Sequence, residues 1–504
     1  MFKRIGDKAR QRIFLIASAI LVAVVAIMSV KIGLQNDTFY TIKVGEHIMQ
    51  HGIDGIDPFS YHNLPYTYPH WLFDVTIYSI YHVFGFAGIY FVTCILAVAL
   101  GLLIYYVCSR LSHNKIAAFI VTLISLVLLN GFLTARAQLV SYILLLLAVY
   151  FIERFLSTGH KRYAIGLVII PAIIANVHAA VYPFYFILFM PYIAAGLAGN
   201  FICRRRQVET TTILGRLVIS QQPRTKWLLL IVVLALIAGL ATPIGLTPYT
   251  YAIKSALGTT MSYIAEHQPT VLAATTLFTV TIILSILILI FTRQKIRLSD
   301  CLMVGGLFLM ALSSNRHIAL LALIGTIPAT KYLAELLQSK NANGRQIANR
   351  FALLTAGLAA ASAAICTMAL VVLAPKLESK MISKDTYPVE AAKFIKSHID
   401  LKKARFYNPY FIGSYLLYND IPVFIDSRAD VYDPKFHGDK NKDVFMDEHY
   451  LNTLTHTYYE DIFKKYKITH ALVDKDSPID LQLAHNNRYK KIYSDDNFVI
   501  YRRK

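Results

Sequence analysis

Long apolar segments recur along the first three quarters of the chain and limit what it can fold into. A transmembrane helix needs roughly 17 to 25 predominantly apolar residues. The runs of this kind lie near residues 13–34, 86–107, 116–133, 138–155, 163–180, 182–202, 227–245, 270–292, 299–314, 317–337 and 350–374. They predict a polytopic membrane domain with about eleven spans.

Composition and charge agree with a membrane protein. Charged residues make up 16% of the 504 residues and hydrophobic residues 56%, whereas soluble domains carry about 25% charge. The formal charge of +20 is distributed in short basic clusters between apolar runs, so a nucleic-acid partner is not expected. From about Lys376 the composition becomes ordinary. We therefore expect a transmembrane domain over 1–375 and a second domain over 376–504.

The basic clusters also predict an orientation. Connections such as "RLSHNK" and "TRQKIR" are rich in Lys and Arg, and they alternate with connections that hold few of either. Lys and Arg collect on the cytoplasmic side of membranes. This places the N-terminus in the cytoplasm, with the first span as an uncleaved anchor, and an odd number of spans places 376–504 outside. The predicted location is the cell membrane, multi-pass.

The first external connection, residues 35–85, is much longer than most of the others. Residues 39–51 and 70–83 show helical amphipathic patterns with aromatic residues, which suit two interfacial helices. Because long external loops commonly carry function, this loop is a candidate region for a functional site.

The tail predicts an extracytoplasmic α/β domain, so the fold class is mainly α with an α/β C-terminal part. "PVEAAKFIKSHI" has a helical pattern, while "ARFYNP", "IPVFIDSR", "ITHALVDK" and "KKIYSDDNFVIYRR" are rich in strand-forming residues. We also expect strand-like structure in "YFIGSYLLY". No Gly-rich phosphate loop is present in the sequence, which disfavours an ATP-driven pump.

Asp37 is the candidate general base, because it follows the first span closely in a loop that can cover it and raise its basicity. A carboxylate that only solvates the helix end is the alternative. Asp57 precedes Pro58 and is a candidate substrate ligand, although an Asp-Pro pair commonly starts a turn.

Further ionisable and amide groups map to the outer ends of the predicted spans. Singly, each could be an interfacial anchor or a contact between helices; together they favour a site on one face. Arginines there suit a lipid phosphate, which they bind through two-point hydrogen bonds. The candidate substrate-binding residues are Asp57, His70, Arg136, His178, Glu266, Arg316 and His317.

No protein-held metal and no cofactor are predicted. His47, His51, His62 and His70 match no zinc spacing, and "DGID" lacks close paired carboxylates. The five cysteines lie in or beside apolar runs. Dependence on a divalent metal stays open.

The sequence resembles the GT-C superfamily of membrane glycosyltransferases. The similarity rests on an Asp after the first span, a long first loop, and the ordered segments "VGEHIMQHG", "HWLFD", "RAQLVSY", "NVHAA", "YIAEHQP", "SSNRHIAL" and "NPYFIGSYLLYNDIPVFIDSRADVY". The resemblance implies a polyprenyl-phosphate sugar donor, Asp37 as catalytic base, and Arg136 and Arg316 as phosphate ligands. Asp37 is not part of an acidic pair, and a "WWDYG" motif is missing from the sequence, so peptide glycosylation is not implied.

We therefore expect an enzyme that transfers a sugar to an extracytoplasmic glycan, lipid or protein, with inversion at the anomeric carbon. Two alternatives stay open: a non-catalytic lipid or polysaccharide transporter, and a cell-envelope assembly factor whose tail binds polymer. In the tail, Asp426 and Arg428 could form a structural ion pair, or with Asp430 could bind the acceptor at the cavity mouth.

Overall fold

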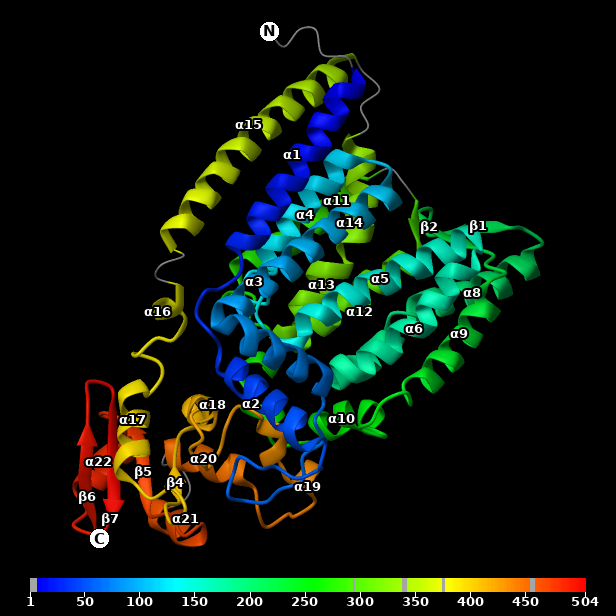
Figure 1. The fold of residues 1–504 in the computed structure, drawn as a ribbon. Helices are drawn as coiled ribbons and strands as arrows, with labels where there is room; N and C mark the ends of the chain where they lie inside the picture. Colours follow the sequence, from blue (N-terminus) through cyan, green and yellow to red (C-terminus); the bar gives the residue numbers. More distant parts are fainter. Residues whose placement is uncertain (1–6, 293–294, 338–341, 374–376, 454–457) are drawn as a thin grey trace.

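The computed structural model describes residues 7–292, 295–337, 342–373, 377–453 and 458–504 (Figure 1). Long helices fill its upper part, and a smaller tail of helices and strands lies below them. Parts of the predicted basic connections and the predicted boundary between residues 375 and 376 lie outside the described residues. The division into two domains stays a prediction.

Helices occupy every apolar run found in the sequence. They are α1 (Asp7–Met28), α3 (Trp71–Ser112), α4 (Lys115–Leu128), α5 (Ala137–Thr158), α6 (Lys161–Val177), α7 (Tyr182–Ile187), α8 (Met190–Arg206), α9 (Thr225–Ala238), α11 (Thr276–Phe291), α12 (Leu298–Ser313), α13 (Ile318–Ile324), α14 (Thr326–Leu337) and α15 (Ala342–Leu373). By length and composition, four helical stretches of the described chain can each cross a membrane, or five if the bent pair α13 and α14 forms one span. The chain is a multi-pass membrane protein; the number eleven stays a prediction.

The first loop folds against the start of α3. The loop contains helix α2 (Asn36–His51), where an interfacial helix was predicted. The second predicted interfacial helix is continuous with the following span, and the break between them is a kink at Gly85, whose φ of 62° is a left-handed value that glycine adopts without strain. At Gly45 the backbones of α2 and α3 approach so closely that a Cβ would lie 2.2 Å from the carbonyl oxygen of Asp74.

Helix α10 (Thr247–Ala256) lies near α2 at the lower end of the long helices (Figure 1). Four short 3₁₀ helices in the connections of this part of the chain are η2 (Ala179–Val181), η3 (Thr260–Ser262), η4 (Ala265–His267) and η5 (Asn315–His317). At the other end, β1 (Thr210–Ile213) pairs antiparallel with β2 (Leu217–Ser220), and β3 (Ile296–Arg297) joins β2 in parallel.

The tail contains a mixed four-stranded sheet of order β4-β5-β7-β6. Its strands are β4 (Phe406–Tyr407), β5 (His470–Asp474), β6 (Tyr489–Ser494) and β7 (Phe498–Arg503), with only the β4–β5 pair parallel. The helices of residues 377–504 are α16 (Leu377–Met381), α17 (Val389–His398), α18 (Tyr410–Tyr418), η7 (Ala429–Tyr432), α19 (Pro434–His437), α20 (Val444–Thr453), α21 (Tyr459–Lys465) and α22 (Pro478–Ala484), of which α16 packs against α3.

Two expectations for the tail were wrong. The strand-like run "YFIGSYLLY" is helix α18. Residues 421–428 form no strand, apart from a single bridge at Val423. The side chain of Asn408 accepts a hydrogen bond from the Phe424 nitrogen at 2.9 Å and donates one to the Ile425 oxygen at 2.8 Å, so it replaces the neighbouring strand that the backbone would otherwise need.

The first loop and the tail share one hydrophobic core. Phe39 of α2 is fully buried, with ring centres 5.0 Å from Tyr387 and 5.2 Å from Tyr415 of the tail. Ser60 forms a parallel bridge with Val423, and Lys43 forms an ion pair with Asp420 at 2.6 Å. The tail is therefore fixed to the loop that follows the first span.

Candidate functional site

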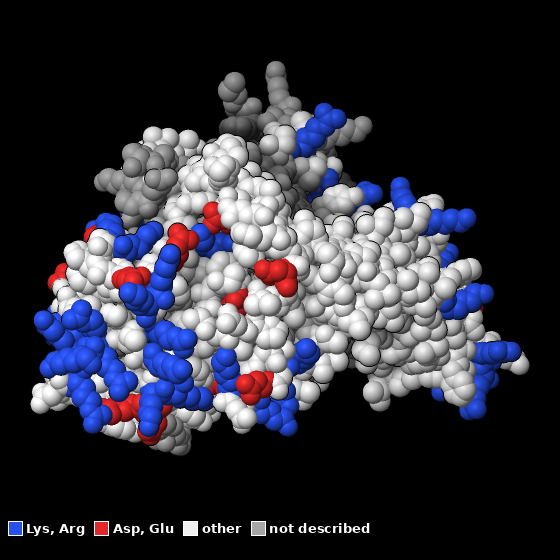
Figure 2. Space-filling model, turned by 60° about the horizontal axis from the view of Figure 1, so that its bottom comes forward, with Lys and Arg blue, Asp and Glu red and all other residues white. Residues whose placement is uncertain are grey.

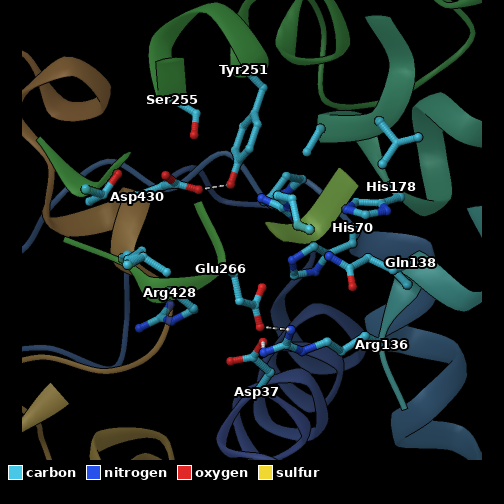
Figure 3. Close-up of a pocket in the computed structure, with 18 of the residues that line it drawn as sticks. Asp37, His70, Arg136, Gln138, His178, Tyr251, Ser255, Glu266, Arg428 and Asp430 are labelled. Atoms are coloured by element: carbon cyan, nitrogen blue, oxygen red, sulfur yellow. Dashed lines mark hydrogen bonds and ion pairs between the residues drawn. The ribbon is translucent and has the colours of Figure 1, made fainter. Parts of the chain in front are cut away.

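A cavity of about 620 Å³ lies where the first loop, the ends of the long helices and the tail meet (Figure 3). This is within the range of about 300 to 1,000 Å³ that is usual for ligand sites. Its walls come from α2, the loop before α3, the start of α5, η2, α10, η4, η5 and the segment around η7. Its lining therefore comes from segments spread over most of the chain.

Seven of the eight candidate residues line this cavity, and Asp57 does not. The seven are Asp37, His70, Arg136, His178, Glu266, Arg316 and His317. Each lies at or beside the end of a helix or in a short 3₁₀ helix, and for that reason its side chain can face the open end of the bundle.

Arg136 joins two acids on one wall of the cavity. Its Nη2 lies 2.6 Å from Asp37 Oδ2 and its Nη1 lies 2.8 Å from Glu266 Oε1. Burial acts to raise the pKa of Glu266, but the charge of Arg136 and its hydrogen bond lower it below its ordinary value. The buried Nε of Arg136 has no partner among the described residues. Arg136 therefore orients two carboxylates on this wall.

Arg316 is in a different electrostatic position. Its Nη1 lies 3.2 Å from His267 Nε2, and within the described ranges it forms no ion pair with a carboxylate. Burial and the charge of Arg316 lower the pKa of His267 to about 4, so the imidazole is neutral near pH 7 and accepts this hydrogen bond. The guanidinium of Arg316 thus faces the cavity without an ion-paired acid, although its charge acts on Glu266 and Asp430, and its free N–H groups suit an anionic ligand.

Two histidines form the adjoining wall. His70 Nδ1 lies 2.9 Å from a carboxylate oxygen of the buried Asp74, and His178 Nδ1 lies 2.9 Å from the Ser141 hydroxyl. Burial acts to lower the pKa of His70, but Asp74 raises it above its ordinary value. The pairing with Asp74 favours a charged His70 in the cavity.

The tail contributes an acid that was named only as an alternative from the sequence. Asp430 lines the cavity and accepts a hydrogen bond from the hydroxyl of Tyr251 on α10 (Figure 3). Burial raises the pKa of Asp430 to about 6. Tyr251 was missed because it lies in an ordinary amphipathic helix, and its partner is 179 positions away in the sequence.

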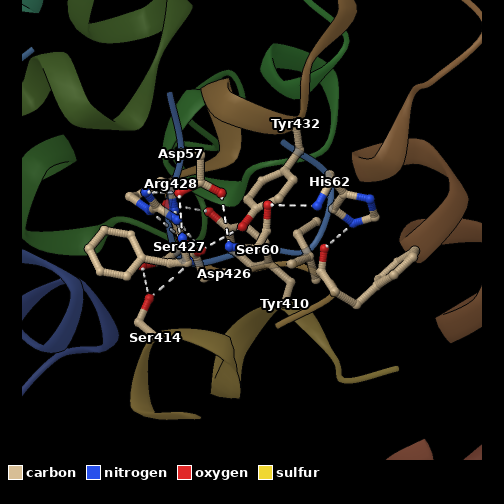
Figure 4. A network of polar contacts seen from close by, with 12 residues as sticks. Asp57, Ser60, His62, Tyr410, Ser414, Asp426, Ser427, Arg428 and Tyr432 are labelled. Carbon is tan, nitrogen blue, oxygen red and sulfur yellow. Dashed lines mark hydrogen bonds and ion pairs between the residues drawn. The ribbon is translucent and has the colours of Figure 1, made fainter. Parts of the chain in front are cut away.

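Asp57 belongs to a buried network beside the cavity, and this network reaches the cavity wall at Arg428 (Figure 4). Arg428 contacts Asp57 Oδ1 at 2.8 Å and Asp426 Oδ2 at 2.6 Å, and its guanidinium carbon is 4.9 Å from the ring centres of both Phe59 and Tyr66. Asp57 also accepts a hydrogen bond from the Ser60 nitrogen at 3.0 Å, as in the turn predicted for an Asp-Pro pair. Asp57 thus ties the first loop to the tail.

The described part of the chain contains no group of three or more His, Cys, Asp or Glu side chains placed to hold a metal ion together. On the wall with most acid groups, Asp37 and Glu266 are both engaged by Arg136.

Neither a protein-family model nor a curated protein sequence matches the chain. Solved structures do match in fold. Oligosaccharyltransferase AglB from Archaeoglobus fulgidus, in complex with an inhibitory peptide and a dolichol-phosphate, aligns with a TM-score of 0.57 over 92% of this chain and 69% of its own, at 14% identity. The same archaeal enzyme, tethered with an acceptor peptide, aligns with a TM-score of 0.56 over 99% of this chain and 74% of its own, at 14% identity.

ArnT from Cupriavidus metallidurans, bound to undecaprenyl phosphate, aligns with a TM-score of 0.54 over 98% of each chain, at 11% identity. The resemblance to GT-C membrane glycosyltransferases is therefore confirmed for the fold over nearly the whole chain. At identities this low the comparisons establish the fold and leave the chemistry to be argued from the site.

Proposed function

We propose that this protein transfers a sugar from a polyprenyl-phosphate carrier to an extracytoplasmic acceptor, and that the transfer takes place in the cavity. The observation that carries the proposal is that Arg316, a cation without an acid partner among the described residues, faces the same cavity as the Asp37 carboxylate. ArnT bound to undecaprenyl phosphate and AglB in complex with a dolichol-phosphate have the same fold, which supports a lipid phosphate as the donor group.

The donor phosphate binds Arg316. A guanidinium offers a planar pair of N–H donors to phosphate oxygens, and its charge stabilises the phosphate that leaves when the bond to the anomeric carbon breaks. No separate general acid is needed, because the leaving group is already an anion.

The acceptor loses its proton to Asp37. Arg136 engages Oδ2 of this carboxylate, which leaves Oδ1 to accept a hydrogen bond from the attacking hydroxyl. The hydroxyl oxygen forms its new bond to the anomeric carbon while the bond to the phosphate breaks, and a single displacement of this kind inverts the configuration. Asp430, held by Tyr251, binds the rest of the acceptor from the tail side.

The test is Asp37→Asn in protein reconstituted with a panel of undecaprenyl-phosphate sugars and candidate acceptors. The amide is nearly isosteric but cannot take the proton, so release of undecaprenyl phosphate should fall by about 10²- to 10⁴-fold, as is usual when a general base is lost. Asp496→Asn, an exposed acid in the turn after β6, is the matched control and should keep the wild-type rate. Near-normal turnover in Asp37→Asn would refute the assigned role of Asp37.

A further inference from the structure

A second feature of the tail is unrelated to the cavity. Six exposed cations gather at one end of the four-stranded sheet: Arg405, Lys467, Lys490, Arg502, Arg503 and Lys504. We call this group the basic sheet end. The strand register brings its members together, because Lys490 lies opposite Arg502 in the β6–β7 ladder, and Arg502 lies opposite His470 on the other side.

The cations of the basic sheet end are not neutralised. Within the described part of the chain, none of the six forms an ion pair, whereas Lys384, Lys393 and Lys465 elsewhere in the tail pair with Glu390 or Asp447. Like charges directly opposite each other in a ladder destabilise a sheet, so the Lys490–Arg502 pair opposes folding. A surface that served only solubility would not require two cations, Lys490 and Arg502, directly opposite each other in neighbouring strands.

Charge is also separated along the strands. The opposite end of the sheet carries Asp474 at the end of β5 and Asp495 and Asp496 in the turn between β6 and β7. In Figure 1, β7 points away from the long helices toward the C-terminus, so its basic end lies far from the membrane part. Figure 2 shows the face turned forward from below, where Lys and Arg side chains crowd together over the left part.

We infer that the basic sheet end is a docking surface for an anionic cell-envelope polymer with repeating phosphodiester groups. Three of the six residues are arginines, which form two-point hydrogen bonds with phosphate oxygens. When protein cations bind a polymer of high charge density, the counterions of the polymer are released, and this release favours binding. The sheet keeps the cations in fixed positions before the polymer binds. Because this end faces away from the bilayer, the headgroups of the membrane that the chain spans are not the partner.

The inference uses the external tail of the proposed function but does not depend on sugar transfer. The basic sheet end would hold the protein, or its product, beside an envelope polymer. Binding should therefore persist in Asp37→Asn, and failure of the catalytic proposal would leave it unaffected.

The experiment uses full-length protein in nanodiscs of neutral lipid, with immobilised poly(glycerol phosphate) as the probe, at two salt concentrations. The variant Lys490→Gln, Arg502→Gln, Arg503→Gln should bind at least about tenfold more weakly and show a shallower dependence on salt, because three phosphate contacts are lost. The matched control, Lys384→Gln, Lys393→Gln, Lys396→Gln near α17, removes the same charge and should bind within about twofold of wild type.

Thermal unfolding separates binding from folding. Since the basic triple variant removes opposed like charges, its Tm should stay the same or rise while binding falls. Equal losses in the two triple variants would overturn the inference, as would absence of polymer binding at low salt. Tighter binding to phosphatidylglycerol vesicles or to double-stranded DNA than to poly(glycerol phosphate) would also overturn it.

Discussion

Arg136 and Arg316 line the same cavity, but within the described residues only Arg136 forms ion pairs with acids. Arg136 is held between Asp37 and Glu266, so a phosphate that approached its charge would have to compete with both carboxylates. Arg316 has only a neutral imidazole as its polar partner in the described structure. The two arginines were equivalent phosphate ligands in the sequence interpretation, and their surroundings now favour Arg316.

Arg316→Lys should therefore weaken donor binding, because an ammonium group cannot form the planar two-point contact with phosphate. We expect the Kd for undecaprenyl phosphate to rise about tenfold or more, equivalent to a loss of about 1.4 kcal/mol of binding energy, and Arg316→Ala to bind still more weakly. The measurement is binding of undecaprenyl phosphate in a titration, with Arg297→Lys, which lies outside the cavity, as the control. Unchanged affinity in Arg316→Ala would remove this residue from the donor site.

Asp430 gives the site a pH dependence. Burial raises its pKa to about 6, the nearby Asp433 adds to the rise, and Tyr251 and Arg316 oppose it. An ionised Asp430 accepts hydrogen bonds from the acceptor, so the acceptor KM should fall as pH rises through about 6. Asp430→Asn should remove that step and leave donor binding unchanged. His70 is present in both proteins, so the difference between the two pH profiles isolates Asp430.

The same pKa shift has the opposite effect on stability. The folded chain binds this proton more tightly than the unfolded chain, in which an Asp has a pKa of about 3.9. The free energy of unfolding therefore decreases as pH rises from about 4 to about 6, and Asp430→Asn removes this decrease. A slope that is unchanged in the variant would show that another group is responsible.

At the scale of elements, the contact between α2 and α3 holds Asp37 in place. A methyl group at Gly45 would lie 2.2 Å from the Asp74 carbonyl oxygen and 2.7 Å from the Tyr78 Cβ, and a backbone oxygen cannot move aside easily. Gly45→Ala should therefore push α2 away and cost about 1–3 kcal/mol or more, as overpacked contacts do. Transfer should fall with it, because α2 carries Asp37.

Gly305→Ala in α12 is the matched control, since nothing lies within 4 Å of a Cβ there. Its Tm should equal or exceed that of wild type, because alanine favours a helix. A Gly45→Ala protein with the Tm and activity of wild type would mean that α2 and α3 are not held in this close contact.

Helices and strands could be predicted from the sequence wherever the apolar residues followed the spacing of one type of secondary structure. The apolar runs and the amphipathic residues 39–51 became helices, and "ITHALVDK" and "KKIYSDDNFVIYRR" became β5, β6 and β7. The segment Tyr410–Tyr418 is apolar on all sides and largely buried, so its period could not distinguish helix from strand. The extended segment 421–428 depends on hydrogen bonds from its backbone to the side chain of Asn408, and a pattern within the segment cannot predict these bonds.

The site was predictable to a similar extent. Ionisable residues at membrane boundaries are costly, and that cost pointed to Arg136, Glu266 and Arg316 before their positions were known. The ion pair between Arg136 and Glu266 was not predictable, because the two residues are 130 positions apart in the sequence. This ion pair is the reason that Arg316, and not Arg136, is the arginine available to an anionic ligand. Asp57 was placed in the right turn, but its partner Arg428 comes from the other end of the chain.

For the molecule as a whole, the orientation across the membrane is the prediction on which the external site depends. A cysteine at the exposed Ser494, in a Cys301→Ser background that removes the exposed native thiol, should react with an impermeant maleimide in intact cells. A cysteine at Leu214, 91% exposed between β1 and β2, should react only after permeabilisation. The reverse pattern of labelling would place the cavity on the cytoplasmic side.

The ion pair between Asp57 and Arg428 joins residues 371 positions apart and has a consequence for biosynthesis. During translation the Asp57 carboxylate is made early, and nearly all the helices of the bundle must be inserted before Arg428 leaves the ribosome. Until then the carboxylate stays hydrated, and Phe39 and Tyr68 have no tail core to enter. A nascent chain released early thus displays an apolar, acidic loop that quality-control proteases can recognise. The wall of the cavity that contains Asp430 is completed only when the end of the chain has arrived, so under the proposed function a partly made protein would lack the acceptor side of its site.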